Sequence, residues 1–321
     1  MKYDSADNAH IGKLRSATAK INIRRIVIVF AVLLFLPGEN IPGRRAPLAS
    51  VTRSLNTKRE FVVYTSLMRR FFVFNLFCLL LFLPLSVCLF QSNAAPSPEI
   101  LRWMGRDWKL TNGGMAGVVK GNPANVSVDA HGYLHLRIVK RDGIYTASEL
   151  FTTEKLGFGT YQWQIEGAVD KMDKTTVLGL FNYGAQAGIG VDAENEIDIE
   201  FSRWNDTCHG CNADFTFYPS TGNKSLGPME DNFTYDPKGA TLTTARFEWT
   251  STRIDGTIMG GLQPLDTTAN VLQTLNFAPP DSLARIPQVP LPLAINFWCF
   301  HGTPDSDQEV IIRNFEYRPS H

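Results

Sequence analysis

The feature that most constrains this chain is a series of short apolar or alternating stretches, separated by Gly, Pro, Asn and Asp. The series runs from Pro96 onward without a sustained helical period. In residues 133–139 (YLHLRIV), Leu134, Leu136 and Ile138 fall on one face of an extended strand. Many short strands favour an all-β sandwich of two antiparallel sheets, and one domain of about 220 residues suits that class. Further strands are predicted over residues 160–166, 177–183, 196–202, 213–218, 245–250, 291–300 and 310–317.

The charge balance argues against a nucleic-acid partner. The 321 residues include 31 Lys and Arg and 31 Asp and Glu, so the formal net charge is zero. A chain without an overall basic field is not expected to attract nucleic acid. The first seventy or so residues are rich in Arg and Lys, whereas the acids lie mostly downstream, so the two parts belong to different classes.

Residues 68–95 have the pattern of a secretory signal peptide: a basic start, an apolar run and then small residues. We expect cleavage after Ala94, with Ala95 as the next choice, so that the mature chain begins near Pro96. The alternative is a membrane anchor that is not cleaved, because residues 71–90 are about long enough to span a bilayer. The expected location is secreted, periplasmic or extracellular, and any membrane contact is expected only through this segment.

Residues 1–67 form a doubtful N-terminal extension, because a signal peptide normally stands at the very N-terminus. The extension carries a second apolar run at residues 26–36 and no readable chemistry. Either the start codon is assigned too early or a cytoplasmic extension precedes the signal. The predicted organisation is therefore extension 1–67, signal or anchor 68–95, and a catalytic-type domain 96–321.

Two of the five cysteines, Cys78 and Cys88, lie in the signal segment. Cys208 and Cys211 frame the motif CHGC, which allows a local disulfide, two free thiols or half of a metal site. A zinc site needs a second pair of ligands, and none is found in the sequence. We therefore assign no metal.

The most informative stretch is residues 195–201, NEIDIEF. On a strand, Glu196, Asp198 and Glu200 share one face, and the apolar residues between them point to the other face. Three acids in line repel one another, which marks either a solvated edge or a functional site. The stretch alone is compatible with both.

Cleavage of a glycosidic bond requires this kind of arrangement, because one carboxyl attacks the anomeric carbon while another donates a proton to the leaving oxygen. Residues four apart on a strand have Cα atoms about 13 Å apart. Side-chain reach and strand twist can bring their carboxyls to the roughly 5 to 5.5 Å of retaining enzymes. We therefore predict retention of anomeric configuration, with Asp198 helping to keep one glutamate ionised and the other protonated.

The motif Glu196-Ile-Asp-Ile-Glu200 resembles the E-x-D-x-E signature of glycoside hydrolase family 16, and its flanking motifs follow in the family's order. The resemblance implies a concanavalin A-like jelly roll whose concave sheet forms a cleft for a polysaccharide. The E-x-D-x-E spacing lacks the extra residue of laminarinase-like members and resembles the lichenase and xyloglucan-active branches. The flanking motifs are SELF at 148–151, GFGTY at 157–161, FEW at 247–249, NFW at 296–298 and IRNFEY at 312–317.

The resemblance also implies roles for individual residues. Glu196 would be the nucleophile, Asp198 its assisting carboxylate and Glu200 the acid/base. Glu149 matches a glutamate that binds sugar hydroxyls, and Tyr183, Tyr218 and Trp298 match aromatic positions on the cleft wall. Ordinary core packing is the alternative for each of these three rings. Trp163, Phe247 and Trp249 are predicted to belong to the core.

The chain departs from the family pattern at four positions. Glu194 replaces a Trp of lichenase-like members, Thr243 and Ala245 replace the usual His and Tyr, and Gln164 replaces a frequent Arg. These departures concern sugar preference more than the reaction. Family members often carry a structural calcium, but no Asp-rich loop here offers enough oxygen ligands to assign one, and no cofactor is expected.

The sequence thus predicts a secreted, monomeric retaining endo-glycosidase that acts on a β-linked polysaccharide. Two alternatives remain at this point. A transglycosylase would use the same covalent intermediate and pass it to a sugar, and a lectin would use the same sandwich for binding alone.

Overall fold

The computed structural model describes residues 99–320. The predicted extension 1–67 and signal segment 68–95 lie outside the described residues. The described part is almost entirely β-structure: sixteen strands are joined by turns, and all but one of the strand pairs are antiparallel. The predicted all-β class is confirmed.

Eight strands form one sheet, called the acid sheet here because it carries the three predicted catalytic acids. Two of its strands, β6 and β15, run through its middle, and β9 lies two strands from β15. In spatial order the acid sheet consists of β1 (Ile100–Trp103), β2 (Arg106–Leu110), β6 (Ile144–Leu156), β15 (Leu291–Cys299), β8 (Thr176–Tyr183), β9 (Glu196–Ser202), β10 (Ala213–Phe217) and β11 (Met229–Phe233).

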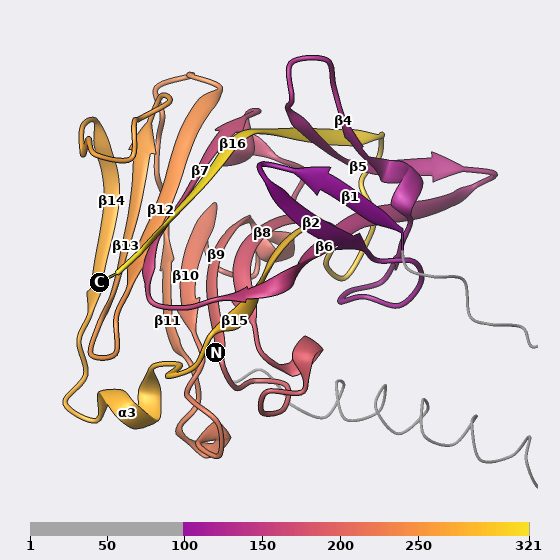
Figure 1. The fold of residues 1–321 in the computed structure, drawn as a ribbon. Coiled ribbons are helices and arrows are strands. Elements are labelled where there is room, and N and C mark those ends of the chain that lie inside the picture. The colour runs from indigo at the N-terminus through magenta and orange to yellow at the C-terminus, as the bar shows by residue number, and fades with distance from the viewer. Residues whose placement is uncertain (1–98, 321) are drawn as a thin grey trace, which may run out of the picture. The chain divides into compact units, whose positions relative to one another are not determined.

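The second sheet packs against the first, and the hairpin of β5 and β6 joins the two. Figure 1 shows β12, β13 and β14 as one wall of the molecule, beside the strands β8 to β10 of the acid sheet. The short strand β3 (Lys120–Gly121) pairs in parallel with β6. In spatial order the second sheet consists of β4 (Val126–Val128), β5 (Leu134–Arg141), β16 (Gln308–Pro319), β7 (Gly159–Glu166), β12 (Leu242–Trp249), β13 (Ile254–Gly260) and β14 (Val271–Phe277).

Helical structure is confined to single turns within the described residues. They are η1 (Pro123–Asn125), η2 (Val169–Lys171), η3 (Ala185–Ala187), η4 (Trp204–Asp206), η5 (Lys224–Leu226) and α3 (Ser282–Arg285). No helix within residues 99–320 combines the length and apolar character needed to cross a bilayer.

The core lies between the two sheets and is rich in aromatic rings. Phe217 of β10 lies 5.9 Å from Phe277 of β14, and Trp108 of β2 lies 6.3 Å from Phe315 of β16, measured between ring centroids. These contacts join one sheet to the other and identify the architecture as a sandwich. The three rings that the sequence assigns to the core, Trp163, Phe247 and Trp249, are fully buried, so that prediction is confirmed.

The predicted strands are all present, with ends that shift by one to three residues. The predicted strands do not include β1 to β4, β6, β11, β13 and β14, although the SELF motif lies on β6; β1, β4, β11 and β14 are edge strands. Edge strands expose much of their side-chain surface, so an apolar alternation does not stand out; β14, for example, has no buried residue. The turn before β7 requires Gly159, because a Cβ there would overlap the backbone carbonyl oxygen of Arg318.

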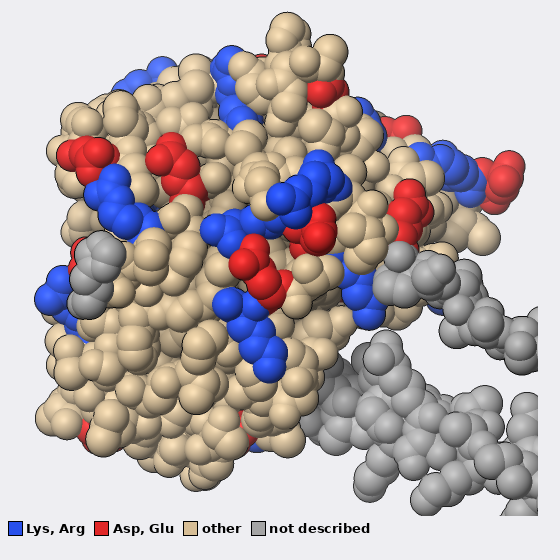
Figure 2. Space-filling view, viewed as in Figure 1, with Lys and Arg blue, Asp and Glu red and all other residues tan. Residues whose placement is uncertain are grey.

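Charges of both signs are interspersed on the face drawn in Figure 2, with broad uncharged areas between them. Several of the described charges pair with one another, among them Arg253 with Glu248 and Asp255, and Arg102 with Asp107. Such exposed pairs each contribute little to stability, so the fold depends mainly on the buried aromatic core.

We predict that Phe247→Ala lowers the free energy of unfolding by about 3 to 5 kcal/mol, because Phe247 is fully buried and lies 4.6 Å from Tyr161 between ring centroids. Urea denaturation followed by tryptophan fluorescence measures the change. Ile144→Ala is the matched control, because Ile144 is 68% exposed, and its effect should stay within about 0.5 kcal/mol. Equal losses for the two variants would contradict the position of the core.

Candidate active site

Strand β9 places the three predicted acids on one face of the acid sheet, as the alternation predicts. Ile197, Ile199 and Phe201 are fully buried in the core between the sheets. Asp198 is 4% exposed, and Glu196 and Glu200 on either side are partly exposed. The face that carries the acids is called the acid face below. A deeply buried central acid between two more accessible ones differs from a solvated surface strand.

Two tyrosines flank Glu196. Tyr183 of β8 is its direct partner across the strand pair, and the backbone N–H of Tyr218, just after β10, donates to the carbonyl oxygen of Glu196. The Tyr183 hydroxyl donates to Oδ1 of Asp192 at 3.0 Å. Burial, followed by the nearby Glu196 charge, raises the pKa of both phenols, so each keeps its proton and can donate a hydrogen bond.

Glu149 lies on the same transverse row of the acid face as Glu200. The row follows from strand register: Glu149 of β6 is opposite Asn296 of β15, Asn296 is opposite Gly179 of β8, and Gly179 is opposite Glu200. The Thr111 hydroxyl donates to Oε2 of Glu149 at 2.7 Å, and Asn296 also bonds the carboxylate. Burial raises the pKa of Glu149 and these two hydrogen bonds lower it.

Gly179 leaves the space beside Glu200 free of a side chain. Its backbone N–H donates to Oδ1 of Asn296 at 3.0 Å, and a Cβ at this position would overlap that same oxygen. The absence of a side chain at Gly179 therefore makes room for the Asn296 amide, which holds Glu149.

A small apolar cluster lies on the acid face, separate from the main core. It consists of Phe151, Phe181 and Ala294, with Tyr183 packed against it. Phe181 is the direct cross-strand partner of Asp198, and its ring lies 6.2 Å from the rings of both Phe151 and Tyr183. These apolar rings beside the acids contribute to the removal of water from the carboxyls.

Trp298 lies farther along the acid face, level with Ser202 rather than with the acids. It is 8% exposed, and its ring packs against Trp204 at 6.2 Å and Phe300 at 6.2 Å. Its Nε1 atom has no hydrogen-bond partner among the described residues. The structure therefore places Trp298 in packed surroundings, at a distance of several residues from Glu196.

The carboxyls of the acid row all have raised pKa values. Burial, followed by the charge of Asp192, raises the pKa of Glu196 to about 8. Burial raises the pKa of Asp198 well above its usual value, with the charges of Glu196 and Glu200 as the next causes. Burial also raises the pKa of Glu200 well above its usual value, and here the largest contributing charge is that of Asp214. All three carboxyls of the row are therefore harder to ionise than carboxyls in water.

Two acids of this site were not predicted from the sequence. Asp214 lies on β10 directly opposite Glu200 and is 2% exposed, and Asp192 lies in the loop before β9 and reaches Tyr183. Asp214 alternates with the buried Phe215, so the sequence pattern places its side chain on the face of a strand opposite to the core, as it does for Glu200. Only the pairing of β9 with β10 shows that Asp214 lies opposite Glu200. Asp192 lies on a loop, where periodicity gives no signal.

The departure at Glu194 has a structural role. Its side chain is 5% exposed, and its carboxylate accepts hydrogen bonds from the backbone N–H groups of Val191, Gly222 and Lys224. Glu194 therefore ties the loop before β9 to the loop after β10. The other departures lie on the second sheet: Thr243 and Ala245 are buried there, and the Gln164 amide donates to the carbonyl oxygen of Gln263.

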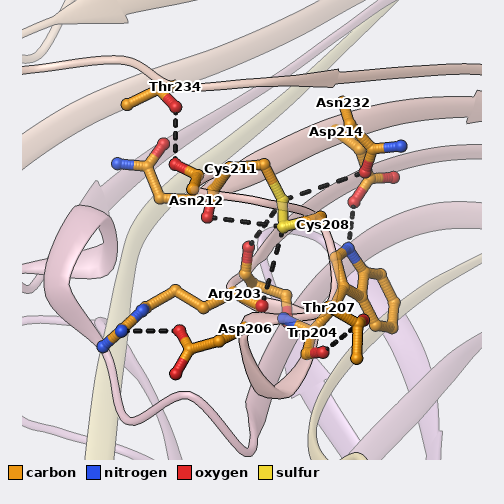
Figure 3. The surroundings of a disulfide bond; sticks show 12 residues. Arg203, Trp204, Asp206, Thr207, Cys208, Cys211, Asn212, Asp214, Asn232 and Thr234 are labelled. Atoms are coloured by element: carbon orange, nitrogen blue, oxygen red, sulfur yellow. Dashed lines mark hydrogen bonds and ion pairs between the residues drawn. A yellow bond between two sulfur atoms is a disulfide. The ribbon is translucent and has the colours of Figure 1, made fainter.

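Cys208 and Cys211 form a disulfide, which decides among the three alternatives that the CHGC motif leaves open. Figure 3 shows it closing the loop between β9 and β10, with Trp204 of the same loop directed at Asp214. Cys299 is buried and free. Within residues 99–320 no three His, Cys, Asp or Glu side chains are arranged to hold a metal ion.

No protein-family model and no curated protein matches this chain. Solved structures similar to it include a Bacillus licheniformis β-glucanase, at 18% identity over 66% of this chain and 92% of the other, with a TM-score of 0.48. A lichenase from a mouse hindgut metagenome has 20% identity over 66% and 93%, with a TM-score of 0.47.

A third similar structure is that of a Bacteroides ovatus protein named as a member of glycoside hydrolase family 16, in complex with a product. It has 12% identity over 66% of this chain and 93% of the other, with a TM-score of 0.49. This is the family that the sequence motifs resemble. Similarities at these levels do not carry an activity over to this chain, so the site itself has to support one.

We predict that Glu196→Gln stabilises the protein more at pH 7 than at pH 4. The pKa of Glu196 is raised to about 8 in the folded state, against about 4.3 when unfolded, so the folded state binds more protons between these values and loses stability as the pH rises through them. Glutamine does not titrate and removes this loss. Thermal unfolding at both pH values measures it, and an equal change in Tm at pH 4 and pH 7 would contradict the environment described for Glu196.

Proposed function

We propose that this protein is a retaining endo-glycosidase of the glycoside hydrolase family 16 type that cleaves a β-linked glucan. The observation that carries the proposal is the acid row of β9: three carboxyls lie on one sheet face, the central one is buried, and the outer two are accessible. A binding protein has no need for three crowded carboxyls, whereas glycosidic cleavage needs an ionised and a protonated one.

Glu196 suits the nucleophile because it is the first acid of the E-x-D-x-E motif, is partly exposed and lies opposite Tyr183. In the proposed first step its carboxylate attacks the anomeric carbon, and the bond to the leaving oxygen breaks. Asp198 is the most buried acid of the row, so it retains its proton and can donate a hydrogen bond to its ionised neighbour. This places the negative charge on Glu196, next to the sugar.

Glu200 suits the acid/base because burial and the charge of Asp214 opposite it raise its pKa well above its usual value, which favours its protonated form. It donates its proton to the leaving glycosidic oxygen in the first step. In the second step it takes a proton from a water molecule, the water oxygen attacks the anomeric carbon, and Glu196 leaves as a carboxylate. Two displacements at one carbon retain its configuration.

The surroundings of the acids offer both kinds of contact that a glucan needs. The Tyr183 edge of the cluster with Phe151 and Phe181 offers an apolar surface for a pyranose face beside Glu196. On the other side of Gly179, Glu149 is held by Thr111 and Asn296 in a position to accept hydrogen bonds from sugar hydroxyls. The proposed substrate-binding residues beside the acids are therefore Glu149, Tyr183 and Tyr218. Trp298 is proposed as a further substrate-binding residue, at the far end of the acid face.

The proposed linkage is mixed or β-1,4. The register of β9 with β8 runs through all three acids without a shift, and its register with β10 is continuous from Ile197 to Glu200, so the strand has no bulge between Glu196 and Glu200. We also propose that the protein acts outside the cytoplasm, which the Cys208–Cys211 disulfide and the signal-like sequence at residues 68–95 support.

A panel of lichenan, xyloglucan, cellulose, laminarin and β-galactans tests the substrate, with linkage analysis of the products. We expect internal cleavage of lichenan or of a β-1,4-glucan by the purified full-length chain. Transfer products that persist at high acceptor concentration would favour a transglycosylase. Binding without cleavage of any glycan would favour a lectin and contradict the proposal.

Azide rescue distinguishes the two glutamates. We predict that Glu196→Ala and Glu200→Ala each lower kcat by on the order of 10³-fold or more on a natural glucan. With an activated aryl glycoside, azide should occupy the vacated space and attack the anomeric carbon. Glu196→Ala should then yield a glycosyl azide of inverted configuration and Glu200→Ala one of retained configuration, as read by NMR. The opposite assignment of products would exchange the two roles.

A further inference from the structure

We propose that Asp214 is a positioning residue that shares a proton with Glu200 and keeps that proton on Glu200. This inference rests on the proposed function, in which Glu200 must be protonated when the glycosidic bond breaks. Four observations carry it: the register of Asp214, its burial, its hydrogen-bond donors and the geometry of the loop that supplies one of them.

The strand register makes Asp214 the nearest cross-strand side chain to Glu200. Glu200 has Gly179 opposite it on β8 and Asp214 opposite it on β10. Directly opposed residues of an antiparallel pair have Cβ atoms about 4.5 to 5.5 Å apart, which brings their carboxyls within reach of one another. On the other side of Glu200, Gly179 has no side chain, and the uncharged amide of Asn296 lies where a Cβ would be. Asp214 is therefore the only acid directly opposite Glu200.

Asp214 is buried and has no counter-charge among the described residues. It is 2% exposed and forms no ion pair within residues 99–320. The charged groups around it are all acids: Glu200 and Asp198 on β9, and Glu230 and Asp231 on β11. Two neighbouring carboxylates, one buried and one only partly exposed, are unfavourable, so the pair holds one proton over a wide range of pH.

The hydrogen bonds decide which acid holds that proton. Trp204 Nε1–H donates to Oδ2 of Asp214 at 2.8 Å, and the Thr216 hydroxyl donates to Oδ1 at 2.9 Å. Both oxygens of Asp214 therefore accept, which favours its ionised form. Burial raises the pKa of Asp214 to about 7, and these donors lower it, whereas the pKa of Glu200 is raised by burial and by Asp214 itself. The proton stays on Glu200.

The loop that supplies Trp204 is held in a strained form. Trp204, Asn205 and Asp206 have φ angles of 47°, 53° and 63°, which are left-handed values that side chains of this kind seldom adopt in succession. The Cys208–Cys211 disulfide closes the turn that follows these residues, and Figure 3 shows the indole N–H directed at Asp214. The ring of Trp204 also packs against Phe300 at 5.0 Å. The hydrogen bond to Asp214 and the packing against Phe300 hold the Trp204 indole, and so its N–H donor, in place.

The test is the alkaline limb of the pH profile of kcat/KM, which reports loss of the proton from the acid/base in the free enzyme. Asp214→Asn removes the charge and keeps the size and an acceptor for Trp204. We expect the alkaline limb to move to lower pH by about 1 unit or more, because the like charge beside Glu200 is gone. A limb that stays in place while wild type retains its activity would overturn the inference and leave the proposed function intact.

Glu230→Gln is the matched control. It removes one negative charge from the same sheet face, but Glu230 is exposed, so solvent screens it and the limb should move far less. An equal shift in both variants would assign the effect to the general field of the face and overturn a specific role for Asp214.

A second readout needs no activity. In protein with ¹³C-labelled Asp and Glu carboxyls, wild-type Asp214 and Glu200 should titrate as a coupled pair, each resonance showing two inflections. Trp204→Phe keeps an aromatic ring but removes the N–H donor to Asp214, so the lower inflection should move to higher pH. Independent single titrations in wild type would overturn the inference even if Asp214→Asn fails to fold. If wild type cleaves no glycan, the proposed function fails, whereas this titration still decides whether the pair exists.

Discussion

The central interaction is the packing of strand β9 by its apolar side against the core between the two sheets. Ile197, Ile199 and Phe201 are fully buried, which holds the intervening acids on the opposite face whatever the electrostatic cost. Each buried apolar side chain contributes about 1.5 to 3 kcal/mol, so the strand can carry a row of carboxyls that repel one another. The raised pKa values of the acid face follow from this arrangement, because it crowds the carboxyls together in largely buried surroundings.

The register of the neighbouring strands makes the three acids different from one another. Glu196 lies between two tyrosines and near Asp192. Asp198 is opposite Phe181 on β8. Glu200 lies between Gly179, which has no side chain, and Asp214. The chemical difference that a glycosidase needs is therefore produced by what stands opposite each acid on β8 and β10. The loops contribute the remaining parts: Glu194 anchors the loop before β9, and the disulfide loop after β9 supplies Trp204.

Much of this could be predicted from the sequence, because the signals are local. The two-residue period showed the strands and which face of β9 carries the acids, and the buried aromatics Trp163, Phe247 and Trp249 were identified correctly. The state of Cys208 and Cys211 was left open and required the structure. Asp214, Asp192 and Gly179 were not identified as site residues, since their roles depend on which residue lies opposite them across a strand pair or on the path of a loop. The edge strand β14 was missed because its side chains are largely exposed.

The most direct test of the acid row is to trap the covalent intermediate. A 2-deoxy-2-fluoro glucoside with a good leaving group forms the glycosyl–enzyme but slows its hydrolysis, because the fluorine destabilises the positive charge that develops at the anomeric carbon. Mass spectrometry of peptides from the trapped full-length protein should find the sugar on Glu196 alone. A label on Glu200, or time-dependent inactivation with the label on a residue outside β9, would contradict the account.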